Sequence, residues 1–207
     1  MPVKPITEDI SGVLIAGGKS RRMGRDKRFL TVGGISLFHR TLTLLEQMFP
    51  ETIVVLAEPV ESLEVRGGRV VYDVIPNAGS LGGLYTGLMA ASHVRIFAVA
   101  CDMPFLNSDV IRFMASFDTT ADIVVAKLEN GFQPLHALYS RSCLPFLKGM
   151  AAERELKIQK LYGTQQLRVT VVDMAEIAIV GAGLKSFQNV NTEGDLARVE
   201  AELAGEL

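Results

Sequence analysis

The strongest constraint on the fold is a regular alternation between short apolar runs and longer amphipathic segments. The run at 10–18, ISGVLIAGG, is rich in branched residues and ends at two glycines, which is typical of a strand buried on both faces of a parallel sheet. We expect further strands at 52–57, 69–73, 95–102 and 121–127 and helices at 36–49, 81–93 and 107–117, with Ser36 and Asn107 as N-caps. This alternation predicts an α/β fold with a doubly wound, mostly parallel sheet and helices on both faces.

The pattern changes in the last third of the chain. Asn130-Gly131 predicts a tight turn, and the segment 134–140 would form the second arm of a late hairpin. Two helical stretches, a strand at 167–174 and an amphipathic helix at 192–203 follow. No internal repeat or low-complexity linker divides the sequence, so we expect residues 1–207 to form a single domain.

The charge balance and the apolar runs exclude some classes of function. The formal net charge is −2 and the sequence pI is about 6.0, so no broad basic face for nucleic acid is expected. No apolar run approaches the ~20 residues of a membrane span, and the first ten residues lack the parts of a signal peptide. Cys101 and Cys143 have neither metal-ligand spacing nor a disulfide framework. We therefore expect a cytoplasmic protein that binds neither nucleic acid nor a membrane.

Five of the 21 Lys and Arg residues are nonetheless concentrated in one stretch, LIAGGKSRRMGRDK at 14–27. Glycines after a buried strand let backbone N–H groups approach phosphate oxygens, and nearby basic side chains neutralise the charge. The stretch is not a Walker A loop, because Val13 stands where that motif needs glycine, and its glycines do not fit G-x-G-x-x-G. A solvated surface loop is the alternative, but open α/β sheets bind ligands at the carboxyl end of this strand, which favours a phosphate site.

Carboxylates that follow predicted strands form a second group of candidates. The stretch ACDMPFL at 100–106 ends a buried strand on Asp102, which we expect to face the same edge of the sheet as the basic loop. Mg²⁺ requires hard oxygen ligands beside phosphates, so Asp102 is the expected metal ligand. A cap of a turn or helix is the alternative for Asp102. Asp73, at the end of the 69–73 strand, is a weaker candidate of the same kind.

Five motifs, in order and spacing, resemble the molybdenum cofactor guanylyltransferases, a family of nucleotidyltransferases with a Rossmann-like α/β fold. They are LIAGGKSRRMGRDK, GSLGGLYTGL, ACDMPFL, QPLHALY and QNVNTEGDL, and the resemblance covers about residues 10–200. The first motif and the aspartate strand are shared with cytidylyl- and uridylyltransferases, whereas Gly17-Gly18 and the Asn-Val-Asn at 189–191 are more specific. The resemblance implies transfer of GMP from GTP to the phosphate of molybdopterin or molybdenum cofactor, with release of pyrophosphate and Mg²⁺ as cofactor. It also implies contacts with cofactor-delivery and acceptor proteins.

The same resemblance implies roles for individual residues. Arg22, Lys27 and Asp102 would be catalytic, with the two cations on the triphosphate and Asp102 on the metal. Nucleotide and pterin would be bound by Leu14, Ala16, Gly17, Gly18, Lys27, Asp73, Gly82, Gly83, Asp102, Asn189 and Asn191. The N-terminal part of the domain would bind the nucleotide and the C-terminal part the acceptor. Tight packing is the alternative for the two glycines at 82–83, and turn chemistry before the last helix is the alternative for the two asparagines.

The chain departs from the family's pattern at three places. Leu56 stands where the family often has a polar residue, commonly asparagine, that helps to read the base. Ser80 replaces a usual proline before Leu-Gly-Gly, and Glu193-Gly194 stands where Pro-Glu is common. Base specificity is therefore left open, and a cytidylyltransferase acting on the same or another phosphorylated acceptor is the nearest alternative. A nucleotide-binding module without catalysis is the other alternative, which the presence of Lys27 and Asp102 disfavours.

Overall fold

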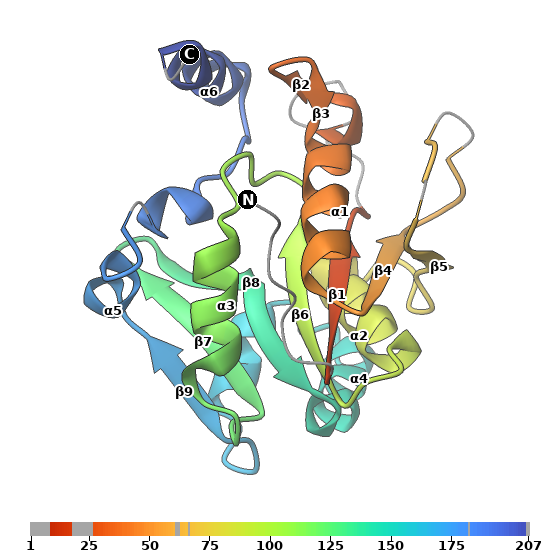
Figure 1. Cartoon of the computed structure of the whole chain (residues 1–207). Helices are drawn as coiled ribbons and strands as arrows, with labels where there is room; N and C mark the ends of the chain where they lie inside the picture. The colour runs from red at the N-terminus through yellow and green to blue at the C-terminus, as the bar shows by residue number, and fades with distance from the viewer. Residues whose placement is uncertain (1–8, 18–26, 61–62, 66, 182, 206–207) are drawn as a thin grey trace.

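The computed structural model describes residues 9–17, 27–60, 63–65, 67–181 and 183–205. Within these residues, seven strands form one sheet in the order β5-β4-β1-β6-β8-β7-β9 (Figure 1). Neighbours from β5 to β6 run parallel, β8 is antiparallel to both β6 and β7, and β9 is parallel to β7. The expected mostly parallel sheet with a late hairpin is confirmed. The strands are β1 (Ile10–Ile15), β4 (Glu51–Leu56), β5 (Arg69–Tyr72), β6 (Arg95–Ala100), β7 (Ile123–Leu128), β8 (Gly131–Ser140) and β9 (Val169–Val172).

Helices cover both faces of the sheet, as the alternation predicts (Figure 1). One face carries α1, α3, α5 and the 3₁₀ helix η4, and the other carries α2, α4 and the 3₁₀ helix η3. All six residues of β1 are buried, because it lies in the middle of the sheet between these two layers. The bounds are α1 (Leu37–Met48), α2 (Gly79–Ala90), α3 (Ser108–Phe117), α4 (Leu144–Ala152), α5 (Met174–Ala178), η3 (Ile158–Gly163) and η4 (Gly183–Phe187).

Two helices begin at the expected caps. The side chain of Ser36 accepts a hydrogen bond from the N–H of His39 at 3.2 Å, and Asn107 Oδ1 accepts one from the N–H of Asp109 at 2.7 Å. Helix α2 differs from the prediction, because it begins at Gly79 instead of residue 81 and has no side-chain cap. The expected start was based on apolar periodicity alone, whereas Gly79 and Ser80, which are small or polar, already belong to the helix.

A small sheet near the N-terminal half of the chain was not predicted. It pairs β2 (Thr31–Val32) with β3 (Ile35–Ser36) through Gly33 and Gly34, whose φ angles of 59° and 78° need glycine. The last helix, α6 (Glu193–Gly205), packs near this hairpin through a cluster that includes Val32 and Val199. The C-terminal segment is thereby brought back to the N-terminal half of the molecule.

Several strand ends also differ from the expected ranges; β9, for example, covers Val169–Val172 instead of 167–174. Strand β6 ends at Ala100, because its neighbour β1 makes its last pairing there with Ile15, so Asp102 lies in a turn beyond the strand. Strand β8 begins at Gly131 instead of residue 134, directly after the turn. None of the described helices is long and apolar enough to cross a membrane.

Candidate active site

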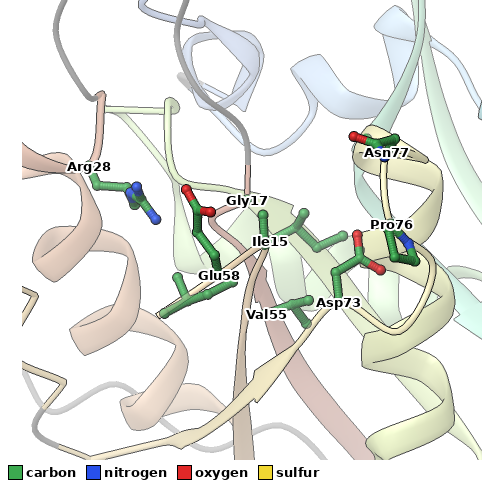
Figure 2. A pocket seen from close by; sticks show the side chains of 12 residues that line it. Ile15, Gly17, Arg28, Val55, Glu58, Asp73, Pro76 and Asn77 are labelled. Atoms are coloured by element: carbon green, nitrogen blue, oxygen red, sulfur yellow. The ribbon is translucent and has the colours of Figure 1, made fainter. Parts of the chain in front are cut away.

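A cavity of about 390 Å³ opens at the carboxyl ends of β5, β4 and β1, where helix α2 begins (Figure 2). The carboxyl ends of parallel strands lie at the same edge of the sheet, which is where open α/β sheets bind ligands. Its walls combine apolar residues from the strand ends with polar side chains from the following loops. The lining residues are Ile15, Gly17, Arg28, Val55, Leu56, Ala57, Glu58, Asp73, Pro76, Asn77, Gly79 and Gly83.

Asp73 is held firmly at the wall of this cavity. Its Oδ1 accepts hydrogen bonds from the N–H of Ile75 and from Thr86 Oγ1, both at 3.0 Å. Thr86 is a buried residue of α2, so the carboxylate is tied both to its own loop and to the helix. The second oxygen, Oδ2, lies 2.7 Å from the position that a Cβ on Gly82 would take. Glycine at 82 therefore leaves room for the Asp73 carboxylate.

The neighbouring glycines also allow the elements that form the cavity to pack closely against one another. A Cβ on Gly83 would lie 2.7 Å from Ile15 Cγ2, so glycine there lets α2 pack against β1 while lining the cavity. Gly17 lies where the chain leaves β1, just after the N–H of Ala16 donates to the carbonyl of Val55 at 2.9 Å. Of the expected pair, Gly83 borders the cavity and Gly82 packs behind Asp73. Close packing therefore explains in part why both positions are glycine.

The remaining residues of the first motif fall into two groups. The side chains of Leu14 and Ala16 are buried in the core beside α1, and Ile15 lines the cavity instead. Lys27 begins the 3₁₀ helix η1 (Lys27–Phe29), and its side chain lies outside the described part. Gly18 and Arg22 also lie outside the described residues.

Three polar residues of the cavity were missed by the sequence prediction. Arg28 is 9% exposed, and its Nη1 lies 3.4 Å from the carbonyl oxygen of Ala16. Glu58 follows β4, and Asn77 precedes α2 with a φ of 63°. Glu58 could have been found by the rule that selected Asp73 and Asp102, because it also follows a predicted strand. Arg28 carries a weaker signal, its position directly after the basic motif.

Asp102 lies one strand further along the same edge, half-buried in the turn after β6. Its carbonyl oxygen accepts a hydrogen bond from the N–H of Val190 at 2.8 Å. The Asn-Val-Asn segment, far away in the sequence, is therefore fastened to the turn that carries Asp102. The structure thus brings together the two motifs expected to hold the metal and the pterin.

Asn189 opens onto a second cavity, of about 320 Å³. Its Oδ1 is buried and has no hydrogen-bond partner among the described residues. The turn before α6 is capped by other groups, since Thr192 Oγ1 accepts from the N–H of Asp195 while the Asp195 carboxylate accepts from the N–H of Thr192. Asn189 is therefore not the cap of this helix. The cavity is lined by Leu128, Asn130, Leu184, Phe187, Gln188, Asn189, Asn191 and Asp195.

The buried titratable groups near the sheet centre do not supply a proton carrier at neutral pH. His136 lies between the rings of Phe97 and Phe187, with centroid distances of 5.5 and 4.3 Å. Burial lowers the pKa of His136 to about 3, and the backbone of Ser186 opposes this only in part. Burial likewise raises the pKa of the Cys143 thiol to about 12. Both groups are neutral at pH 7 and belong to the core.

A sequence profile of the MobA-like NTP transferase domain matches residues 12–169, from β1 to the start of β9. The chain belongs to the MobA-like NTP transferase family. Enzymes of this family are nucleotidyltransferases and typically use a divalent metal ion. The described residues hold no group of three His, Cys, Asp or Glu side chains that could bind a metal by themselves.

Two relatives of this family match nearly the whole chain. A probable molybdenum cofactor guanylyltransferase from Pelotomaculum thermopropionicum is 35% identical over 195 residues, which is 93% of each chain. The molybdenum cofactor guanylyltransferase of Desulfosudis oleivorans is 32% identical over 198 residues, covering 94% of this chain and 96% of its own. Membership of the MobA-like family is thus supported from β1 through the Asn-Val-Asn segment.

A solved structure shares the fold of this MobA-like protein. The molybdopterin-guanine dinucleotide biosynthesis protein A of Archaeoglobus fulgidus superposes with a TM-score of 0.82 at 24% identity. The superposition covers 95% of this chain and all of that one. At this identity the likeness shows the fold.

Proposed function

We propose that the protein transfers GMP from GTP to the terminal phosphate of molybdopterin and releases pyrophosphate. The observation that carries this proposal is the order of features along the carboxyl edge of the sheet. A cavity lies at β5, β4 and β1, Asp102 follows β6, and the segment fastened to Asp102 opens onto a second cavity. Such an order suits a nucleotide and an acceptor that meet at Asp102. The names of the two relatives supply the identity of the nucleotide and of the acceptor.

The chemistry of this transfer needs little from acid or base side chains. A phosphate monoester has its second pKa near ~6, so the acceptor is already largely ionised at pH 7. Transfer to the α-phosphorus then depends on in-line positioning and on neutralising the charge of the leaving pyrophosphate. The neutral, core-buried His136 agrees with a mechanism that uses no general base.

The triphosphate is assigned to the basic stretch that follows β1. In the proposal, backbone N–H groups around Gly17 and Gly18 contact phosphate oxygens, and Arg22 and Lys27 neutralise the charge. Gly17 borders the first cavity, so a nucleotide bound there would lie beside the start of this stretch. The roles of Gly18, Arg22 and the Lys27 side chain depend on the motif alone.

Asp102 fits the role of a magnesium ligand. Its carboxylate is a hard oxygen donor on the turn between the two cavities, and Mg²⁺ is usually held by one or two carboxylates together with substrate phosphates and waters. A cluster of three protein ligands is therefore not required. When bound, Mg²⁺ would polarise the α-phosphate and neutralise part of its charge. Asp102 would hold the cation in place, and its carbonyl oxygen accepts the hydrogen bond that fastens the acceptor segment.

The acceptor is assigned to the second cavity. The buried Oδ1 of Asn189 lacks a partner among the described residues, and an amide can donate to and accept from the edge of a heterocycle such as a pterin. Asn191 lies on the same cavity from the other side of Val190. Contacts with cofactor-delivery and acceptor proteins also belong to the proposal.

A nucleotide panel tests the proposed substrate. Calorimetry with GTP, CTP, UTP and ATP in the presence of Mg²⁺ should show GTP bound at least tenfold more tightly than CTP, which is about 1.4 kcal/mol. Addition of molybdopterin should then release pyrophosphate from GTP. Equal or reversed affinities would favour a cytidylyltransferase, and tight GTP binding without transfer would favour a non-catalytic module.

The Lys27→Ala variant tests the assignment of the basic stretch. A cation on the leaving phosphates acts in the transition state, so the turnover rate should fall far more than the thermal stability. Wild-type turnover in this variant would remove Lys27 from the site.

A further inference from the structure

The first cavity has polar groups suited to reading a base, although Leu56 takes the place of the family's usual polar residue. The Leu56 side chain is buried in the core and is 3% exposed. Asp73 has its Oδ1 engaged by Ile75 and Thr86. Glu58, in the loop that begins after Leu56, is exposed and lines the cavity.

Figure 2 shows how the charged side chains are arranged around this cavity. Glu58 and Arg28 extend toward one another from one side, while Asp73 and Asn77 lie toward the other. Arg28 comes from η1 and is nearly buried, so its guanidinium is a fixed source of N–H donors. The cavity therefore carries a carboxylate acceptor next to a cationic donor.

Guanine is the nucleic-acid base whose edge complements such a pair. Its N1–H and 2-amino group are two adjacent donors, which the two oxygens of one carboxylate can accept together, and its O6 acceptor lies next to N1–H. Cytosine would turn its N3 and O2 acceptors toward a carboxylate, and two acceptors facing each other repel. A carboxylate at this place thus selects for guanine and against cytosine.

We propose that Glu58 determines the nucleotide specificity of the enzyme by accepting hydrogen bonds from N1–H and the 2-amino group of guanine. This inference rests on the proposed function, because it takes the first cavity as the nucleotide site. The strand order supports the placement. Glu58 follows β4, which lies two strands from β6 and Asp102, so a base at Glu58 leaves the phosphates free to extend past β1 toward Asp102.

Inosine triphosphate provides a direct test, because hypoxanthine keeps N1–H and O6 but lacks the 2-amino group. Calorimetry should show that the wild-type protein binds GTP at least tenfold more tightly than ITP. Glu58→Ala removes both acceptors and should bring the two affinities within about twofold of each other. Glu58→Gln keeps the size and one acceptor oxygen, but its NH₂ would face a donor of guanine, so the GTP to ITP ratio should fall here too.

The control is Glu153→Gln, which changes an exposed carboxylate at the end of α4, outside both cavities. It should keep the wild-type ratio, and thermal unfolding should show that all three variants fold. A purely structural role of Glu58 would weaken both nucleotides alike and leave the ratio unchanged.

The outcomes separate this inference from the proposed function. If Glu58→Ala retains the wild-type preference for GTP over ITP while GMP transfer continues, the assignment of Glu58 is overturned and the function stands. If the wild-type protein binds CTP more tightly than GTP, the proposed function fails first, and the assignment of Glu58 fails with it.

Discussion

The backbone N–H of Val190 donates a hydrogen bond to the carbonyl oxygen of Asp102 at 2.8 Å, and this bond joins the two halves of the proposed site. Asp102 comes from the turn after a central strand, whereas Val190 lies between the two asparagines that precede the last helix. The bond uses only backbone atoms, so side-chain substitutions at Asp102 and Asn189 leave it in place. In the proposed function, this bond would hold the metal ligand and the acceptor segment in a fixed relation.

Replacing Asp102 with asparagine should nearly abolish guanylyl transfer. The change keeps the shape and one acceptor oxygen but removes the charge that would hold Mg²⁺. GTP binding should also lose most of its dependence on Mg²⁺, while circular dichroism reports an intact fold. Asp109→Asn, on the exposed first turn of α3, is the matched control and should transfer normally. Transfer at close to the wild-type rate across a Mg²⁺ titration would show that Asp102 is a structural residue, with Asp73 the next candidate.

Replacing both Asn189 and Asn191 with alanine should weaken the binding of molybdopterin and leave GTP affinity nearly unchanged. The buried Oδ1 of Asn189 has no described partner to lose, and Thr192 with Asp195 caps α6. The melting temperature should therefore change little. A clear loss of thermal stability with unaltered pterin binding would contradict the acceptor assignment and favour turn chemistry.

Gly82→Ala should weaken GTP binding at least tenfold. The new Cβ would lie 2.7 Å from Asp73 Oδ2, and the hydrogen bonds to Ile75 and Thr86 prevent the carboxylate from simply rotating away. Calorimetry measures the effect, and Ser80→Ala, an exposed change on the same helix, serves as the control. An unchanged GTP affinity in Gly82→Ala would mean that the position of Asp73 does not matter for the nucleotide.

Glu51 should make the stability of the protein depend on acid pH. Burial raises the pKa of this carboxyl, but hydrogen bonds from Ser11, Ser92 and Arg69 outweigh it and lower the pKa to about 2. Because the pKa in the folded state lies below the ordinary value of 4.5, the stabilisation is complete above about pH 4.5 and is lost as the pH falls toward 2.

Comparison of the wild type with Glu51→Gln measures this contribution. The variant should be less stable by about 1–3 kcal/mol at pH 7, and the difference should fade between about pH 4.5 and 2. Glu153→Gln, an exposed change, should follow the wild-type curve. A difference that stays constant down to pH 2 would show that Glu51 acts through packing and not through its charge.

The parts of the molecule that could be predicted are those governed by local patterns. The buried run at β1, the N-caps Ser36 and Asn107, and the placement of Asp73 and Asp102 after strands all follow from periodicity and from the rule that parallel strands end at one edge. The hairpin after β7 could also be predicted from a local pattern, because Asn-Gly at 130–131 is typical of a tight turn between two antiparallel strands.

The parts that were missed depend on contacts between distant segments or on elements too short to show a period. Arg28 enters the cavity only because η1 folds against the end of β1, which no spacing in the sequence reveals. The two-residue strands around Gly33 have no measurable alternation. The bond from Val190 to Asp102 joins segments between which the structure describes three strands, three α-helices and three 3₁₀ helices, so only the folded chain shows it.

The central position of β1 has a consequence for how the chain is made. One partner of β1, strand β4, is synthesised soon after it. The other edge of β1 stays unpaired until β6 has been synthesised, because Ile10 pairs with Arg95. Synthesis of the intervening residues 57–94 takes roughly 2 to 8 s at about 5–20 residues per second. During that time a mostly apolar strand presents one open edge, which strands of other nascent chains can join. Slower translation of this stretch would therefore increase aggregation in the cell without changing the stability of the finished protein.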